Sequence, residues 1–205
     1  MDRHRARRIA RPAARKINMQ DLLDDLTSGD DARAEKSIPA IVDLGKAAIS
    51  PLLELTCAQN ADSRWWAVRA LAASRHTQSA HLIPLLDDPA PDVRAAAALA
   101  LCDRPDDDAI PALIKTLADE DSIAAGLAAN ALVKIGKPAT LSLVEEAAHA
   151  PINIRIYALR ALGEIRDHRA IPILMKSMSE ESAVLQYWAQ IGLERLGLDM
   201  VYIKP

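Results

Sequence analysis

Apolar residues in this chain recur at helical spacing, in short segments separated by polar stretches. One such stripe consists of Ile110, Leu113, Ile114 and Leu117. The spacing i, i+3, i+4, i+7 is that of a helix buried along one side. A proline in the second position of this segment, Pro111, suits a first helical turn, where its missing amide is not needed. The pattern therefore predicts short amphipathic helices.

A second pattern, Ala-x-x-Ala-Leu, recurs along the chain at a nearly constant interval. Its leucines are Leu71, Leu101, Leu132, Leu162 and Leu193, so successive copies are 30 or 31 residues apart. Each copy follows a polar residue that can cap a helix, and its alanines lie where another helix must come close. Each period thus predicts two antiparallel helices, an alanine-rich A helix and a B helix with the amphipathic stripe.

We expect about twelve antiparallel helices: an opening helix near residues 19–28, five A/B pairs, and a lone A helix near residues 182–196. Neither helix of a pair can bury its apolar side alone, so neighbouring repeats must stack into one continuous core. The predicted fold is all-α, a right-turning α-solenoid. We expect residues 17–205 to form this repeat domain and residues 1–16 to form a basic arm.

The repeat resembles a known family. The residues that carry the resemblance are Asp92-Val93-Arg94, Ala97, Ala100-Leu101 and the segment 109–113, with a second good copy from Asn153 to Pro172. They are similar to the short HEAT repeat, and in particular to the HEAT-like repeat of phycobilisome lyases, over roughly residues 31–197. The resemblance implies a superhelix with B helices along its concave surface, and it also suggests a phycobilin lyase subunit or a related chromophore-handling factor. Function does not follow from such a fold alone.

Composition agrees with a helical chain, since aromatic residues make up 3%, phenylalanine is absent and there are seven glycines. The longest uncharged runs are too short to span a bilayer, which takes about 20 residues. Two cysteines, Cys57 and Cys102, give no disulfide framework, so we expect a cytoplasmic protein.

Charge is distributed unevenly along the chain. Residues 1–16 hold seven basic residues against Asp2, a net +6, whereas the whole chain has a net charge of −3, which leaves −9 for the body. Four arginines of the arm are spaced by four: Arg3, Arg7, Arg11 and Arg15. The arm is either a solvated extension or a contact for nucleic acid, an acidic surface or an acidic protein.

Motifs for catalysis or for a cofactor are not evident. The sequence has no glycine-rich phosphate loop, no Gly-x-Ser-x-Gly elbow and no His-Glu pair of the kind that binds iron in HEAT-like hydroxylases. We therefore expect no cofactor, no metal and no enzymatic activity.

The phase of the B helices predicts a binding surface on their outer side. With Leu113 and its stripe buried, the positions predicted to point outward into the concave groove are Leu52, Ala112, Lys115, Thr116, Leu143, Glu146, Ile173 and Lys176. An apolar column flanked by mixed charge suits a protein partner or a peptide, although a tight superhelix would bury the column. Trp65 and Trp66 form a second candidate at the rim, with one ring packed and the other half-exposed.

We therefore predict a non-enzymatic scaffold that binds a protein through its concave face. One alternative is the phycobilin lyase subunit or chromophore-handling factor. The other is a nucleic-acid-binding HEAT-like array, which the acidic body disfavours.

Overall fold

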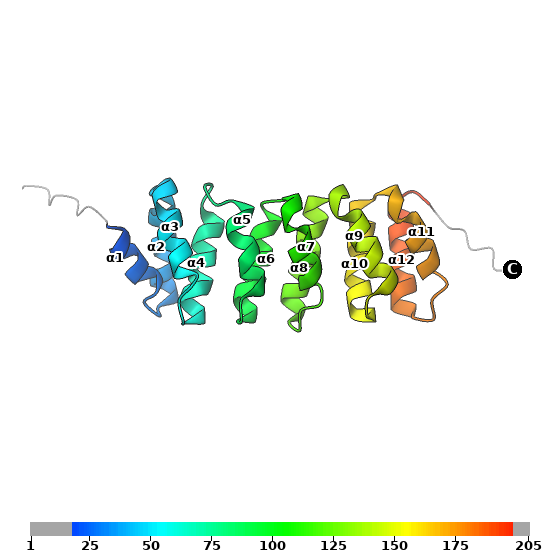
Figure 1. The fold of residues 1–205 in the computed structure, drawn as a ribbon, viewed down its shortest axis with the longest axis horizontal. Coiled ribbons are helices and arrows are strands. Elements are labelled where there is room, and N and C mark those ends of the chain that lie inside the picture. Colours follow the sequence, from blue (N-terminus) through cyan, green and yellow to red (C-terminus); the bar gives the residue numbers. More distant parts are fainter. Residues whose placement is uncertain (1–17, 199–205) are drawn as a thin grey trace, which may run out of the picture.

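The computed structural model describes residues 18–198, and this part of the chain contains twelve α-helices and no strand (Figure 1). The helices are α1 (Met19–Leu26), α2 (Asp31–Asp43), α3 (Ile49–Leu55), α4 (Ala61–Ala73), α5 (Ser79–Leu82), α6 (Pro91–Cys102), α7 (Ile110–Thr116), α8 (Ser122–Ile135), α9 (Thr140–His149), α10 (Ile152–Ile165), α11 (Ile171–Ser177) and α12 (Ala183–Arg195). Short 3₁₀ segments lie beside the B helices. The all-α solenoid prediction is confirmed.

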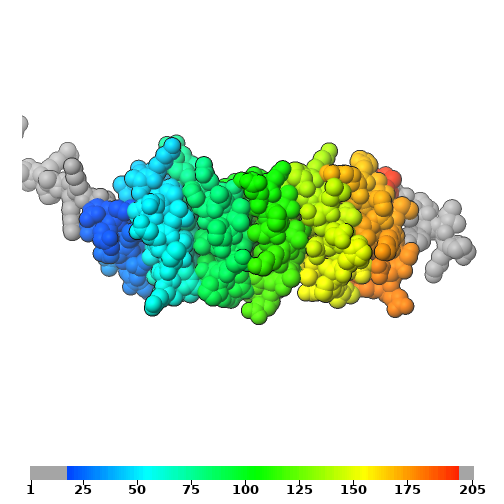
Figure 2. Space-filling view, in the orientation of Figure 1, coloured from blue at the N-terminus to red at the C-terminus, as the bar shows by residue number. Residues whose placement is uncertain are grey.

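The helices follow one another in a single row, as predicted. After α1, five pairs run from α2/α3 to α10/α11, and α12 is the last helix within residues 18–198. In the space-filling view each repeat forms a slab across the width of the array (Figure 2). Each slab contacts mainly its neighbours in sequence, as expected of a solenoid.

Polar side chains begin several helices where the sequence pattern places a cap. Asn18 accepts a hydrogen bond from the Gln20 amide, and Asp121 accepts from the amides of Ile123 and Ala124. These contacts satisfy amide groups that have no partner within the first turn.

The A helices α4, α6, α8, α10 and α12 pack directly on one another. Small side chains permit this approach: Ala128 of α8 and Ala158 of α10 are completely buried. The contact between α10 and α12 is closer still, because a Cβ atom on Gly163 would lie 3.0 Å from the Cα atom of Gly192, and the backbone there would have to shift. The Ala-x-x-Ala-Leu face is therefore a helix–helix contact.

Glycine-to-alanine replacements provide a matched test of this packing. Gly163→Ala is expected to destabilise the array by about 1–3 kcal/mol, because the new methyl group must push two backbones apart. Gly126→Ala in α8 is expected to stabilise it by about 0.5–1 kcal/mol, because its Cβ atom meets nothing nearer than Tyr157 at 4.0 Å and alanine favours a helix. Chemical denaturation of both variants measures the difference, and equal shifts would contradict the close α10–α12 contact.

Candidate functional site

The predicted binding column on the B helices does not point outward as a whole. Leu52 and Leu143 have no exposed surface, and Ile173 and Thr116 are 6% and 5% exposed. Ala112 and Glu146 are half-buried, while Lys115 and Lys176 are exposed. The expectation of an exposed apolar column is therefore wrong.

The error is one of register between repeats. The fully buried positions of successive B helices are Leu52, Leu82, Leu113, Leu143 and Leu174, which are 30 or 31 residues apart. The predicted column aligned Leu143 with Ala112 instead of Leu113, a shift of one residue. Because successive residues of a helix point about 100° apart, that shift exchanges core and surface positions.

The A helices carry a groove on the described surface that is lined by small apolar residues and by charged side chains. One part, of about 440 Å³, lies over α4 and α6, and a second, of about 360 Å³, lies over α6, α8 and α10. Leu99 and Leu127 line both parts, so the two parts adjoin each other. We call it the A-face groove, and it lies on the opposite helix layer from the one that the sequence predicted.

Small residues form the floor of the groove, and apolar side chains project beside it. Ala95 and Ala96 of α6 stand at the positions that Trp65 and Trp66 occupy in α4, one repeat earlier. Leu99 projects beside them and is 55% exposed. An apolar floor of this kind binds a ligand by removing apolar surface from water.

Each end of the groove carries an arginine stacked on an aromatic ring. At one end the Arg69 guanidinium lies 5.1 Å from the Trp65 ring centre, and at the other the Arg160 guanidinium lies 5.7 Å from the Tyr157 ring centre. Arg69 also donates to the Glu35 carboxylate at 2.7 Å, and Arg160 donates to Asn130 at 3.0 Å. Both distances to the rings lie within the range of cation–π attraction. Each end of the groove thus carries a planar guanidinium group, and that of Arg69 is paired with Glu35.

The tryptophan pair divides as predicted. Trp66 is 8% exposed and packs in the core, whereas Trp65 is half-buried and lines the groove. The two rings meet edge to face with centroids 4.8 Å apart. The sequence singled out Trp65, but it did not reveal that Arg69 stacks on it, because the pairing depends on side-chain rotamers.

A second depression, of about 480 Å³, adjoins the groove at the amino-terminal ends of α2, α4 and α6. Its wall includes Asp31, Asp62, Asp92 and both tryptophans. Asp92 and Trp65 also line the groove, so the two depressions share a wall. We call it the acidic hollow.

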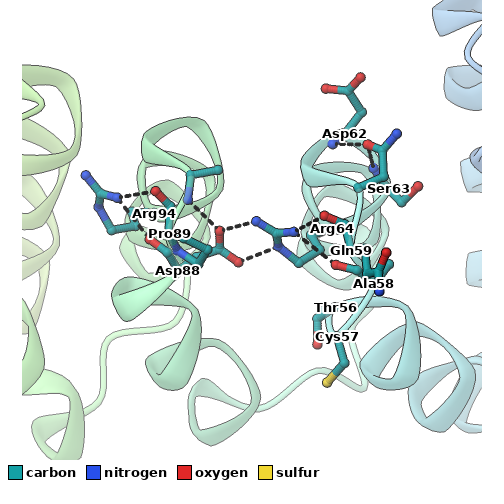
Figure 3. A network of polar contacts seen from close by, with 12 residues as sticks. Thr56, Cys57, Ala58, Gln59, Asp62, Ser63, Arg64, Asp88, Pro89 and Arg94 are labelled. Atoms are coloured by element: carbon teal, nitrogen blue, oxygen red, sulfur yellow. Dashed lines mark hydrogen bonds and ion pairs between the residues drawn. The ribbon is translucent and has the colours of Figure 1, made fainter.

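Buried ion pairs join successive repeats, and Figure 3 shows the one between Arg64 and Asp88. Arg64 of α4 holds both carboxylate oxygens of Asp88 at 2.7 and 2.8 Å and donates to the Ala58 carbonyl. Arg94 does the same to Asp119 one repeat later, at 2.6 and 2.7 Å. We call these bidentate contacts clamps, because each ties one inter-helix loop to the next.

The clamps change the ionisation of their acids. Burial alone would raise the pKa of Asp88, but hydrogen bonds from Arg64 and from the Ala90 amide outweigh it and hold that pKa below its usual value. The hydrogen bonds from Arg94 likewise lower the pKa of Asp119. Both carboxylates are therefore charged at neutral pH.

Two earlier expectations concern other parts of the chain. The basic arm with Arg3, Arg7, Arg11 and Arg15 lies outside the described residues. No helix within residues 18–198 is long and apolar enough to cross a membrane.

Comparison with known families identifies the repeats. Residues 79–153 match HEAT repeats, and residues 154–180 match the PBS lyase HEAT-like repeat. The resemblance found in the sequence is thus confirmed over residues 79–180.

Two curated relatives are named as a phycobilisome maturation protein and a phycocyanobilin lyase subunit. A phycobilisome maturation protein of Synechococcus elongatus is 35% identical over 105 residues, 51% of this chain and 50% of the relative. The phycocyanobilin lyase subunit beta of a Nostoc species is 33% identical over 101 residues, 49% of this chain and 50% of the relative. The chain therefore spans about half the length of the curated relatives it matches.

A solved structure agrees with these relatives. The complex of CpcE and CpcF of phycocyanin lyase from Nostoc contains a chain that is 25% identical to this one, with a TM-score of 0.55. The match covers 70% of this chain and 96% of that chain.

These findings correct the functional expectation. The relatives are named as a lyase subunit and a maturation protein, and the solved complex is that of a lyase. The expectation of a non-enzymatic scaffold is therefore wrong, and the alternative of a phycobilin lyase subunit or chromophore-handling factor is favoured.

Proposed function

We propose that this chain, whose residues 79–153 match HEAT repeats and whose residues 154–180 match the PBS lyase HEAT-like repeat, is a subunit of a phycobilin lyase or a related chromophore-handling factor. Its task is to hold an open-chain tetrapyrrole and to present it to an acceptor protein. The observation that carries this proposal is the A-face groove, with its apolar floor and an arginine at each end.

The chemistry of the ligand matches that of the groove. A phycobilin is a conjugated, largely apolar chain of four pyrrole rings with two propionate groups. The rings suit the floor formed by Ala95, Ala96 and Leu99, and the propionates suit Arg69 and Arg160. Guanidinium groups bind carboxylates through two parallel hydrogen bonds, which fix orientation as well as charge.

The protein groups that already bind Arg69 and Arg160 compete only weakly with a ligand carboxylate. Glu35 holds Arg69, but their side chains are 57% and 41% exposed, so the pair is solvated and worth little in stability. Arg160 has an amide and a carbonyl as partners rather than a carboxylate. A ligand carboxylate can therefore exchange with these contacts at low cost.

A second protein completes the proposed activity. One relative is named as a beta subunit and the solved complex pairs two proteins, and we infer that this chain also acts with a second HEAT-repeat subunit. The closing helix α12 supports this, because Tyr187 and Val184 are 55% and 40% exposed at an end of the array where the described residues contain no further repeat.

Titration with phycocyanobilin tests the proposal. The full chain is expected to bind the pigment saturably, with a shift in pigment absorption and quenching of tryptophan fluorescence. Arg69→Ala and Arg160→Ala are each expected to weaken binding about tenfold to a hundredfold, because each removes a charge-assisted hydrogen bond. Arg33→Ala is the matched control, since Arg33 pairs with Asp25 and does not line the groove.

If Arg69→Ala and Arg160→Ala bind phycocyanobilin as tightly as the control Arg33→Ala, the A-face groove is not the pigment site. Failure of the full chain to bind phycocyanobilin at all would contradict the proposed function. With a second lyase subunit and an acceptor apoprotein, the wild-type chain should also support covalent attachment of the pigment, visible as colour that survives denaturation.

A further inference from the structure

We infer that the Arg160 end of the A-face groove is its stronger carboxylate site, and that Gly126 makes it so by leaving Arg160 without an acidic partner. The inference rests on the proposed function, because it ranks the two ends of the groove that is proposed to hold the pigment. Two observations carry it: the partners of two arginines at equivalent positions, and the charges that line the two parts of the groove.

Arg69 and Arg160 occupy equivalent positions in their repeats. Each lies two residues before the leucine of the Ala-x-x-Ala-Leu pattern, and each donates a hydrogen bond to the residue 34 positions earlier, in the preceding A helix. For Arg69 that residue is Glu35, whose carboxylate lies at 2.7 Å. For Arg160 it is Gly126, whose backbone carbonyl lies at 3.3 Å. Glycine therefore stands where the other end of the groove carries an acid.

Gly126 leaves open space beside the Arg160 guanidinium. A Cβ atom on this glycine would meet nothing nearer than the Tyr157 ring at 4.0 Å. The remaining partner of Arg160 is the Asn130 side chain at 3.0 Å, so among the described residues no carboxylate neutralises this arginine. Arg160 is also half-buried, and a guanidinium that is partly removed from water attracts a carboxylate more strongly than a solvated one. A ligand carboxylate can thus take the place that Glu35 holds at the other end.

The side chains that line the two parts of the groove differ in charge. The part over α4 and α6 has three acids against one arginine, a net −2: Glu35, Asp92, Asp103 and Arg69. The part over α6, α8 and α10 has two cations against one acid, a net +1: Lys134, Arg160 and Glu164. That single acid is held by Arg195 at 2.6 Å. An anionic group of the ligand is therefore attracted to the second part and repelled from the first.

The difference between the two ends predicts unequal effects of the two arginines. Arg160→Ala is expected to weaken pigment binding more than Arg69→Ala, because Arg160 has no competing acid. Glu35→Gln is expected to strengthen binding about threefold, because it frees Arg69 from an exposed ion pair of small energy.

An acid installed at position 126 tests the inference in a titration of the full chain with phycocyanobilin. Gly126→Glu reproduces beside Arg160 the arrangement of Glu35 and Arg69, so its carboxylate competes with that of the ligand. We expect it to bind the pigment about tenfold more weakly than Gly126→Gln, which fills nearly the same volume without a charge. Both replacements favour a helix more than glycine does, and circular dichroism melts establish that both variants are folded.

The double variant Gly126→Glu/Arg160→Ala separates competition for Arg160 from any other effect of the added charge. With Arg160 absent, the new glutamate has no guanidinium to occupy, so the double variant is expected to bind about as weakly as Arg160→Ala alone. The two changes are then strongly non-additive, as expected of two groups in direct contact.

Equal affinities of Gly126→Glu and Gly126→Gln, in a chain that binds the pigment, would overturn this inference and leave the proposed function intact. A further tenfold loss on adding Gly126→Glu to Arg160→Ala would also contradict it, because the acid would then act without Arg160. Failure of the wild-type chain to bind the pigment would instead refute the proposed function, and this inference with it.

Discussion

Replacing Leu143 with aspartate is expected to unfold the array, whereas the same replacement at Leu141 is expected to leave it folded. Both residues lie in α9, but Leu143 has no exposed surface and Leu141 is 61% exposed. An unpaired carboxylate at position 143 would be buried at a cost of several kcal/mol, out of a typical total stability of about 5–15 kcal/mol. Circular dichroism melts of the two variants measure the difference.

The comparison decides the register of the repeats. Leu143 belongs to the buried column with Leu113 and Leu174, so a collapsed melt for Leu143→Asp supports that alignment. A near-native melt for the same variant would mean that Leu143 faces solvent and that the B-helix column is a surface after all. Leu141→Asp provides the control for the intrinsic cost of aspartate within α9.

Removing the arginine of a clamp is expected to be nearly as damaging. Arg64→Ala leaves Asp88 buried and without its partner, and breaking a buried pair in this way costs about 3–5 kcal/mol. Lys115→Ala is the matched control, because Lys115 pairs with the adjacent Asp87 at 2.6 Å while both side chains are largely exposed. Its loss should cost at most about 1 kcal/mol. Urea denaturation of the two variants gives both values.

The stability difference between wild type and Arg64→Ala should depend on pH if Arg64 acts through its ion pair with Asp88, and should not if it acts through packing alone. The folded pKa of Asp88 lies below its unfolded value of about 3.9. Its contribution to stability is therefore present above that unfolded value and is lost as the pH falls through the folded pKa. The gap between wild type and Arg64→Ala should narrow below about pH 4, because Asp88 can then be buried in its neutral form. A gap that stays constant down to low pH would show that Arg64 acts through packing alone.

The clamps follow an arginine that recurs along the chain. Asp-x-Arg or Asn-x-Arg elements lie at Asp62/Arg64, Asp92/Arg94 and Asn153/Arg155, and Arg155 pairs with Glu180, 25 residues ahead. The structure pairs each arginine with a carboxylate 24 or 25 residues ahead. In α8 the equivalent residue is Ala125, which shows that not every repeat carries a clamp.

Much of this protein was determined by local sequence. The number and order of the helices, the buried alanines and the division between Trp65 and Trp66 follow from spacing and side-chain size, which act within one or two turns. The family resemblance followed from the same short-range pattern.

The tertiary structure alone decided which surface is hollowed. Sequence spacing placed the binding face on the B helices, but an error of one residue in aligning Leu143 with Ala112 exchanged core and surface. The groove on the A helices depends on small residues of α6 lying between the larger side chains of α4 and α10, which are 30 or more residues away. The periodicity of a sequence predicts which side of a helix is apolar. A groove is formed by several helices together, so it exists only after they have packed.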